Sequence, residues 1–421
     1  MDVPPKDLPE GVTALGAGRW ALPRPVWLLG WVSFFTDTAT EMVYPLLPLF
    51  LTRTLGAGAM SLGIIEGVAE AANSVLKILS GRLTDKWGTP KPIVLVGYVL
   101  SSAMRPLIGL ASSWTHVLTL RFADRLGKGI RGAPRDAMLA TFASPEQRGR
   151  IYGFHRAMDH AGAVLGPLLA TAFLYFYPEN YRTLFALTII PGIIVVILLL
   201  RLPNVRTTAP PQSVSARNSQ LPTPNAPPSL KLRGARLSPE LVKALAIILI
   251  FSLGNASDAF LLLRLTDLGI AAVWVPLLWS ALHVVKVGSS VIGGELSDRF
   301  GRRAMIGLGW IVYALVYAGF GFFDTPALVI AVFLSYGLYF GFTEGVEKAW
   351  IADLADASER GTAFGYYNAV LGVGSLIASL LFGFIWTRVS PHAAFLTGSA
   401  LALVASALLY TVASDDRRIR P

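Results

Sequence analysis

Acidic side chains recur at helical spacing inside long apolar segments of this 421-residue sequence. Asp37 and Glu41 are four residues apart in the first segment, and Glu66 and Glu70 repeat that spacing in the second. Residues four apart share one face of a helix. Neighbouring desolvated carboxyl groups raise one another's proton affinity, so these pairs are candidates for proton uptake and release. Each of them is equally suited to neutralise a basic residue elsewhere.

Charged, mostly basic side chains form a stripe on the fourth apolar segment. At 100° per residue they fall within an arc of roughly 120° on a helix. A charge at membrane depth is costly unless it is paired or hydrated, so the stripe predicts an internal cavity rather than a lipid contact. The stripe consists of Arg121, Asp124, Arg125, Lys128, Arg131 and Arg135.

His155 and Asp159 are four residues apart in the fifth segment, a spacing that allows contact between them. Because His titrates near physiological pH, both a proton relay and a structural bond fit this pair.

No set of His, Asp and Glu has metal-ligand spacing, so we expect no metal and no cofactor beyond coupling protons. Further candidates for the cavity wall are Tyr44, Asn255, Asp258, Lys286 and Glu344.

The composition is that of a membrane protein. Hydrophobic residues make up 53% of the chain and charged residues 15%, and the mean hydropathy is +0.56. The net charge of +10 comes from basic residues spread over short loops, which argues against nucleic-acid binding. The absence of Cys excludes disulfides and thiolate chemistry. Residues 1–25 lack the apolar core of a cleavable signal peptide.

About twenty apolar residues suffice for a membrane-spanning helix, and the sequence contains twelve such stretches. Loop charges place both termini in the cytoplasm. The predicted spans are 26–52, 57–80, 93–112, 115–141, 151–176, 183–202, 239–265, 269–294, 304–323, 326–354, 362–387 and 392–413.

These spans predict an all-α membrane protein made of two six-helix bundles, at 26–203 and 239–413. The intervening stretch 204–238 is rich in Pro, Ser, Thr, Asn and basic residues, and is predicted to be a cytoplasmic linker. We expect a cytoplasmic N-terminal segment at 1–25 and a cytoplasmic tail at 414–421.

One loop motif occurs in both halves, which indicates an internal duplication. Asp298 follows Asp85 by 213 residues, and Arg360 follows Arg148 by 212. Glycine permits a tight turn or close helix approach, and the Asp can latch a neighbouring helix start or an arginine. The motif comprises Gly81, Asp85 and Gly88 in the first copy, and Gly294, Asp298, Arg299, Gly301 and Arg302 in the second.

With this duplicated motif the chain resembles transporters of the major facilitator superfamily over essentially its whole length. The resemblance implies two pseudo-symmetric bundles, with spans one, four, seven and ten lining a central cavity that opens to alternate sides. It also implies a monomer in the inner (cell) membrane, surrounded by lipids and carrying a small-molecule substrate. The fifth span is similar to the family's antiporter motif through Gly162, Gly166 and Pro167. Plain close packing of helices explains the same glycines.

A charge-paired gate is predicted from the repeat. Glu347 and Lys348 in the tenth span follow Arg135 and Asp136 by 212 residues, with opposite charges at matched positions. Pseudo-symmetry would bring them together on the cytoplasmic side of the cavity. We therefore expect Arg135 to pair with Glu347 and Asp136 with Lys348 in the outward-facing state.

Together these features favour a proton-coupled secondary active transporter for a small organic solute. The basic stripe favours an anionic or zwitterionic solute, and the antiporter-type motif favours export. Import of a metabolite or of a siderophore-like chelate stays open as an alternative. Two other classes, a non-coupled lipid scramblase and a membrane-embedded enzyme, also stay open, although no nucleophile and base constellation supports an enzyme. No nucleotide-binding loop is present, so an ion gradient is the expected energy source.

Overall fold

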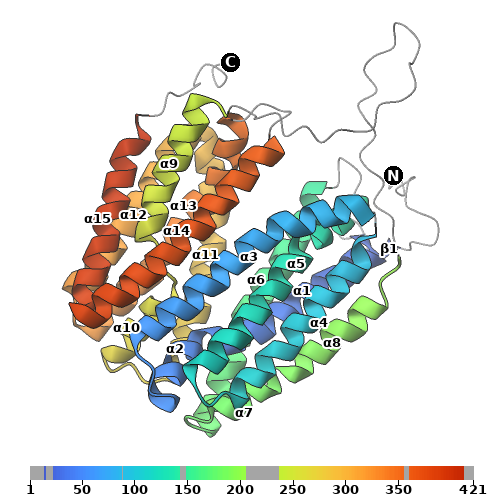
Figure 1. Cartoon of the computed structure of the whole chain (residues 1–421), viewed down its shortest axis with the longest axis horizontal. Coiled ribbons are helices and arrows are strands. Elements are labelled where there is room, and N and C mark those ends of the chain that lie inside the picture. Colours follow the sequence, from blue (N-terminus) through green and yellow to red (C-terminus); the bar gives the residue numbers. More distant parts are fainter. Residues whose placement is uncertain are drawn as a thin grey trace, which may run out of the picture.

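The computed structural model describes residues 14–15, 22–87, 89–142, 148–204, 237–354 and 360–411. Apart from a two-stranded hairpin of β1 (Ala14–Leu15) and β2 (Leu22–Pro23), the regular structure of these residues is helical. Figure 1 shows two helical bundles side by side, which spread apart toward the end where α1 starts and α15 ends.

The N-terminal bundle contains six membrane-spanning segments in its described part, as predicted. Three of them are built from consecutive shorter helices. The elements are α1 (Arg24–Val43), η2 (Tyr44–Leu46), α2 (Leu47–Leu49), η3 (Phe50–Thr54), α3 (Ala59–Trp87), α4 (Pro90–Leu107), η4 (Ile108–Leu110), α5 (Trp114–Thr141), α6 (Arg148–Phe176), α7 (Tyr181–Leu187) and α8 (Ile189–Leu200).

The C-terminal bundle repeats this plan, with six spans among its described residues. The prediction of twelve helices in two bundles is therefore confirmed, whereas the predicted linker at 204–238 lies mostly outside the described residues and stays a prediction. The elements are α9 (Pro239–Gly254), α10 (Ala259–Asp267), α11 (Trp274–Phe300), α12 (Arg302–Phe322), α13 (Pro326–Leu354), α14 (Arg360–Arg388) and α15 (Pro391–Leu409).

Eight of the described spans are long and apolar enough to cross a membrane by composition alone. The segments outside that group are 24–54, 59–87, 114–141 and 274–300. These four carry most of the ionisable side chains singled out from the sequence. Their lower hydropathy reflects charge that faces the protein interior, because charge facing lipid would be too costly.

The helices extend further toward the cytoplasm than their apolar stretches do. The predicted second span stops at Ser80, whereas α3 continues to Trp87, and α11 likewise continues to Phe300. The duplicated motif predicted in loops therefore lies largely on the last turns of these two helices. Beyond the hydrocarbon core a helix can carry charged side chains at little cost, since water solvates them.

The two bundles pack through helix pairs related by the repeat. α3 contacts α14, and α6 contacts α11. Glycines permit this close approach: a Cβ atom on Gly63 would lie 2.3 Å from the carbonyl oxygen of Ser379 on α14. Gly372 of α14 fits against Ser74 of α3 in the same way. The small residues thus place the charged faces of α3 and α11 next to the interface.

The first and seventh spans are interrupted at equivalent places. The α-helix of the first span ends at Val43, where Pro45 follows in a 3₁₀ turn, and the seventh span breaks between Gly254 and Ala259. Tyr44 and Ser257 are 213 residues apart, the repeat offset, and their hydroxyl oxygens lie 3.3 Å from each other. Paired helix breaks at the repeat interface are typical of solute and ion sites in transporters.

Candidate functional site

A cavity of about 460 Å³ lies between the two bundles, beside the paired helix breaks. Both halves line it, and most of its polar wall comes from α1, α3, α5, α11 and the break of the seventh span that precedes α10. Nine residues predicted from the sequence belong to its wall. They are Glu41, Tyr44, Glu66, Glu70, Arg125, Lys128, Asn255, Asp258 and Lys286.

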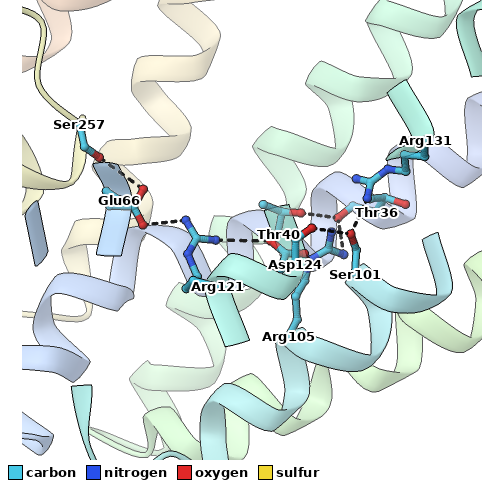
Figure 2. Close-up of polar contacts among 9 residues, drawn as sticks. All are labelled: Thr36, Thr40, Glu66, Ser101, Arg105, Arg121, Asp124, Arg131 and Ser257. Atoms are coloured by element: carbon cyan, nitrogen blue, oxygen red, sulfur yellow. Dashed lines mark hydrogen bonds and ion pairs between the residues drawn. The ribbon is translucent and has the colours of Figure 1, made fainter. Parts of the chain in front are cut away.

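A chain of ion pairs begins at this wall and runs into the N-terminal bundle (Figure 2). Glu66 accepts a hydrogen bond from the Arg121 guanidinium at 2.8 Å, and Arg121 also lies 3.6 Å from the Asp124 carboxylate. These three side chains are at most 7% exposed. Charge-assisted bonds of this kind hold a buried carboxylate in its ionised form. Arg121 and Asp124 therefore support the cavity wall from behind rather than line it.

Arg105 of α4 continues this chain and was not anticipated from the sequence. Its Nε atom lies 3.3 Å from Asp124 Oδ1, and its side chain is only 4% exposed. Arg131, predicted for the cavity, instead donates to Ser101 Oγ at 2.6 Å and lies over the Tyr98 ring. A lone Arg in an otherwise apolar span was the available signal for Arg105, since such a residue needs a buried partner.

Arg125 differs from the other arginines of the stripe. It is 7% exposed and lines the cavity, yet its guanidinium makes no hydrogen bond or ion pair with any residue that the structure describes. Lys128 lines the same wall one turn further along α5 and interacts electrostatically with Asp37 and Glu41. Arg125 thus presents unused N–H donors to the cavity.

The opposite wall is formed by Asp258, Lys286 and aromatic rings. Asp258 accepts a hydrogen bond from the Tyr336 hydroxyl at 2.7 Å. Its other oxygen lies 3.7 Å from the Lys286 ammonium, which is too far for a hydrogen bond. The ammonium also lies 3.6 Å from the centroid of the Phe340 ring and 5.2 Å from that of Trp279.

Glu41 joins the two halves. One of its carboxylate oxygens accepts a hydrogen bond from the Trp279 indole N–H at 2.7 Å. Nearby, Ser257 Oγ lies 3.4 Å from the second oxygen of Glu66, and the Asn255 amide lies 3.4 Å from the Tyr339 hydroxyl. Carboxylates of the N-terminal half therefore bind neutral donors of the C-terminal half across the cavity.

A second group of predicted residues lies on the cytoplasmic half of α6, outside the cavity wall. Asp159 accepts a hydrogen bond from Ser33 of α1 and lies 3.6 Å from His155. Arg156, the neighbour of His155 in the sequence, bridges the halves through a 2.9 Å ion pair with Glu344 of α13. Asp37 is half-buried on α1, within electrostatic reach of Asp159.

The predicted gate pairs are not formed in this structure. Arg135 pairs with its own neighbour Asp136 at 2.9 Å, while Glu347 is buried and accepts bonds from Trp310 and Tyr367. The Arg156–Glu344 pair is instead the ion pair that links the bundles on the cytoplasmic side among the described residues. Arg135 and Glu347 each bind a partner within their own bundle, since residues at matched repeat positions need not face each other. The pairing stays a prediction for the outward-facing state, in which Lys348 would join it.

The duplicated motif is only partly described. The side chains of Gly81, Asp85, Gly294 and Asp298 and the whole of Gly88 lie outside the described residues. Gly301 has φ of +86°, which lets α12 start directly after α11. Arg302 pairs with Asp353 of α13 at 2.6 Å, and Arg299 is exposed.

The antiporter-type glycines pack α6 tightly against α1. A Cβ atom on Gly162 would lie 2.3 Å from the Phe34 carbonyl oxygen, and one on Gly166 would lie 2.4 Å from that of Thr38. Pro167, inside α6, is buried. Close packing is therefore what these residues do here, whatever their part in transport.

The described part of the site contains no cluster of metal ligands. Among the residues that the structure describes, no group of three or more His, Asp or Glu side chains is arranged to hold a metal ion.

Comparison with known proteins yields a consistent result. The sequence model described as "Major Facilitator Superfamily" matches residues 29–346 and 266–421. An uncharacterised MFS-type transporter of Methanocaldococcus jannaschii is 33% identical over 394 residues, which cover 92% of this chain and 94% of the relative. The multidrug resistance protein MdtH of Aeromonas hydrophila is 25% identical over 362 residues, 85% of each chain.

Solved structures agree on the fold. A crystal structure of the peptide transporter POT superimposes with a TM-score of 0.76 at 13% sequence identity. The match covers 96% of this chain and 97% of that one. At this identity the likeness concerns the arrangement of the helices and not the solute.

Proposed function

The chain belongs to the Major Facilitator Superfamily, and from that premise we propose that it is a proton-coupled secondary active transporter of a small organic anion or zwitterion. It is a multi-pass protein of the inner membrane. The observation that carries this proposal is the cavity between the bundles, which Arg125 lines from the N-terminal half and Lys286 from the C-terminal half, each without a hydrogen-bond acceptor among the described residues. Alternating access would expose this cavity first to one side and then to the other.

The charge of the solute follows from which charges are already neutralised. Glu66 is paired with Arg121, and Asp258 lies beside Lys286 and Tyr336. No described residue accepts a hydrogen bond from the Arg125 guanidinium, and its electrostatic neighbours Glu41 and Asp124 are bound to other groups, so a carboxylate or phosphate of the solute would complete the site. The rings of Trp279 and Phe340 add an apolar surface for the remainder of the solute.

Proton coupling is supported by the carboxylates that bind neutral donors. Glu41 accepts from an indole N–H and Asp258 from a phenol, and both line the cavity. A neutral donor can hydrogen-bond to the carboxylate and, more weakly, to the carboxylic acid, whereas a guanidinium strongly favours the carboxylate. Glu41 and Asp258 are therefore better proton carriers than Glu66 or Asp124.

The test uses a matched series of small aromatic compounds: benzoate as anion, benzamide as neutral analogue and benzylamine as cation. Benzoate, but not the other two, should raise the thermal unfolding temperature of the purified protein, because a ligand of the folded state stabilises it by mass action. Arg125→Gln should weaken benzoate binding about 10- to 100-fold, the loss of a hydrogen bond to a charged group. Arg388→Gln, at the far end of α14, is the control.

Flux in proteoliposomes completes the test. Benzoate accumulation that depends on an imposed pH gradient and exceeds that in protein-free liposomes, into which neutral benzoic acid diffuses, supports the proposal. Stabilisation by benzylamine with none by benzoate would refute an anion site, and lipid movement without any gradient would point to a scramblase instead.

A second candidate function is drug export in exchange for protons. It is favoured by the similarity to MdtH proteins, which are named for multidrug resistance, and by the Gly162, Gly166 and Pro167 motif. An exporter of this kind should extrude lipophilic cations from loaded vesicles when protons flow in the opposite direction.

A further inference from the structure

Lys286 of α11 is held in the cavity wall without a hydrogen-bond acceptor. Its ammonium lies 3.7 Å from Asp258, and none of its N–H groups donates to a residue that the structure describes. Its side chain is 13% exposed, and the Phe340 ring supports one side of it. A long ion pair of this kind is Coulombic only, so an incoming carboxylate at normal hydrogen-bond distance would bind the ammonium more strongly.

Asp258 has a second partner, Tyr336, whose hydrogen bond does not depend on Lys286. The Tyr336 hydroxyl donates to it at 2.7 Å, and Tyr336 itself is only 1% exposed. Asp258 directly precedes α10 and lies within the break of the seventh span. If the Lys286 ammonium binds a solute anion instead, the Asp258 carboxylate keeps its hydrogen bond from the Tyr336 phenol but loses its nearby cation. A negative charge without a cation is costly in this largely buried site.

We propose that a solute anion and Asp258 compete for Lys286, and that Asp258 takes up one proton when the anion wins. This inference rests on the proposed anion site. Before binding, the pair is an ammonium and a carboxylate; afterwards the ammonium donates to the solute, and Asp258 is a neutral carboxylic acid. The O–H bond formed on Asp258 replaces one broken in a hydronium ion, which is left as water, and the net charge of the cavity is unchanged. Anion and proton therefore travel in the same direction, opposite to the exchange predicted from the antiporter-type motif.

Other titratable groups near Asp258 are compatible with this role. Its electrostatic neighbours from the surrounding elements are Tyr44 of η2, His283 and Lys286 of α11, Tyr313 and Tyr317 of α12, and Tyr336 and Tyr339 of α13. Lys286 is the only lysine or arginine in this described group. Its engagement by the solute is thus the event that most changes the field at Asp258.

The experiment measures protons directly. Benzoate is added to the full-length protein in weakly buffered detergent solution that contains a pH indicator, over a range of pH values. The wild-type protein should take up close to one proton per benzoate bound at neutral pH. Asp258→Asn should bind benzoate without taking up protons, and Glu240→Gln, on the cytoplasmic surface, should behave as wild type.

Transport gives an independent readout. After subtraction of the uptake by protein-free liposomes, the wild-type protein should accumulate benzoate along an inward proton gradient, whereas Asp258→Asn should not. Tyr336→Phe, which removes the phenol that stabilises the carboxylate, should move the midpoint of proton uptake to higher pH. This variant keeps the test decisive even if Asp258→Asn does not fold.

The outcomes separate the two proposals. Absence of benzoate binding to the wild-type protein would overturn the proposed function. Binding with no proton uptake, or with proton release, would overturn only the competition between solute and Asp258. Unchanged proton uptake in Asp258→Asn would assign the proton to another carboxylate.

Discussion

The buried carboxylates of the two bundles have different kinds of partner. In the N-terminal bundle, Glu66 and Asp124 lie against arginines. In the C-terminal bundle, Glu347 accepts hydrogen bonds from the Trp310 indole at 3.0 Å and from the Tyr367 hydroxyl at 3.1 Å, and Asp258 accepts one from a phenol. Repeats with the same helix plan thus carry different electrostatics.

This difference suggests a division of labour. Arginine stays charged at every accessible pH, so the Glu66–Arg121–Asp124 chain keeps its charges throughout a transport cycle and acts as a rigid frame. A carboxylate such as Glu347, held by an indole and a phenol, can gain or lose a proton without leaving a buried cation behind. The aromatic core of the C-terminal bundle, where Tyr313 stacks on Tyr317 and Tyr336 on Tyr339, supplies these donors.

The largest effect should come from breaking the frame. Arg121→Met leaves two carboxylates, each at most 7% exposed, without their shared cation. Removal of one partner from a buried ion pair costs about 3 to 5 kcal/mol. Chemical unfolding in mixed micelles should show this loss. The double variant Arg121→Met/Glu66→Gln should recover part of it, and its failure to do so would show that the arginine acts through packing alone.

A smaller loss is expected for the matched change in the other bundle. Glu347→Gln keeps an oxygen that accepts from Trp310 or Tyr367, so it should cost about 1 kcal/mol, the net value of one hydrogen bond. The same unfolding assay measures it. A loss as large as that of Arg121→Met would mean that the bundles do not differ in the way described.

The smallest effect concerns Asp324, which lies outside the membrane-spanning segments, between α12 and α13. Hydrogen bonds from His392 and from Arg264 hold the pKa of the Asp324 carboxyl below its usual range. A lowered pKa in the folded state contributes stability above the unfolded value of about 3.9, and this contribution is lost as pH falls through the lowered value. The unfolding temperature of the wild type should therefore fall more steeply than that of Asp324→Asn between about pH 5 and pH 3. Parallel curves would show that the cluster adds nothing.

The membrane architecture was readable from the sequence because its causes are local. Hydrophobic length sets where a helix can span, and the cost of charge in lipid requires every buried ionisable residue to face inward. The duplicated motif identified the repeat and, through it, the family. The same reasoning placed Glu41, Asp258 and Lys286 at the cavity.

The tertiary structure alone decided which charges meet. Arg105 joins Asp124 from a different helix, and Arg156 rather than Arg135 reaches across to the partner bundle. Tyr44 meets its repeat equivalent Ser257 because both helices break at the same depth. Ion pairs and hydrogen bonds depend on separations of a few ångströms between residues far apart in sequence, and helical periodicity specifies a face but not the neighbour that it meets.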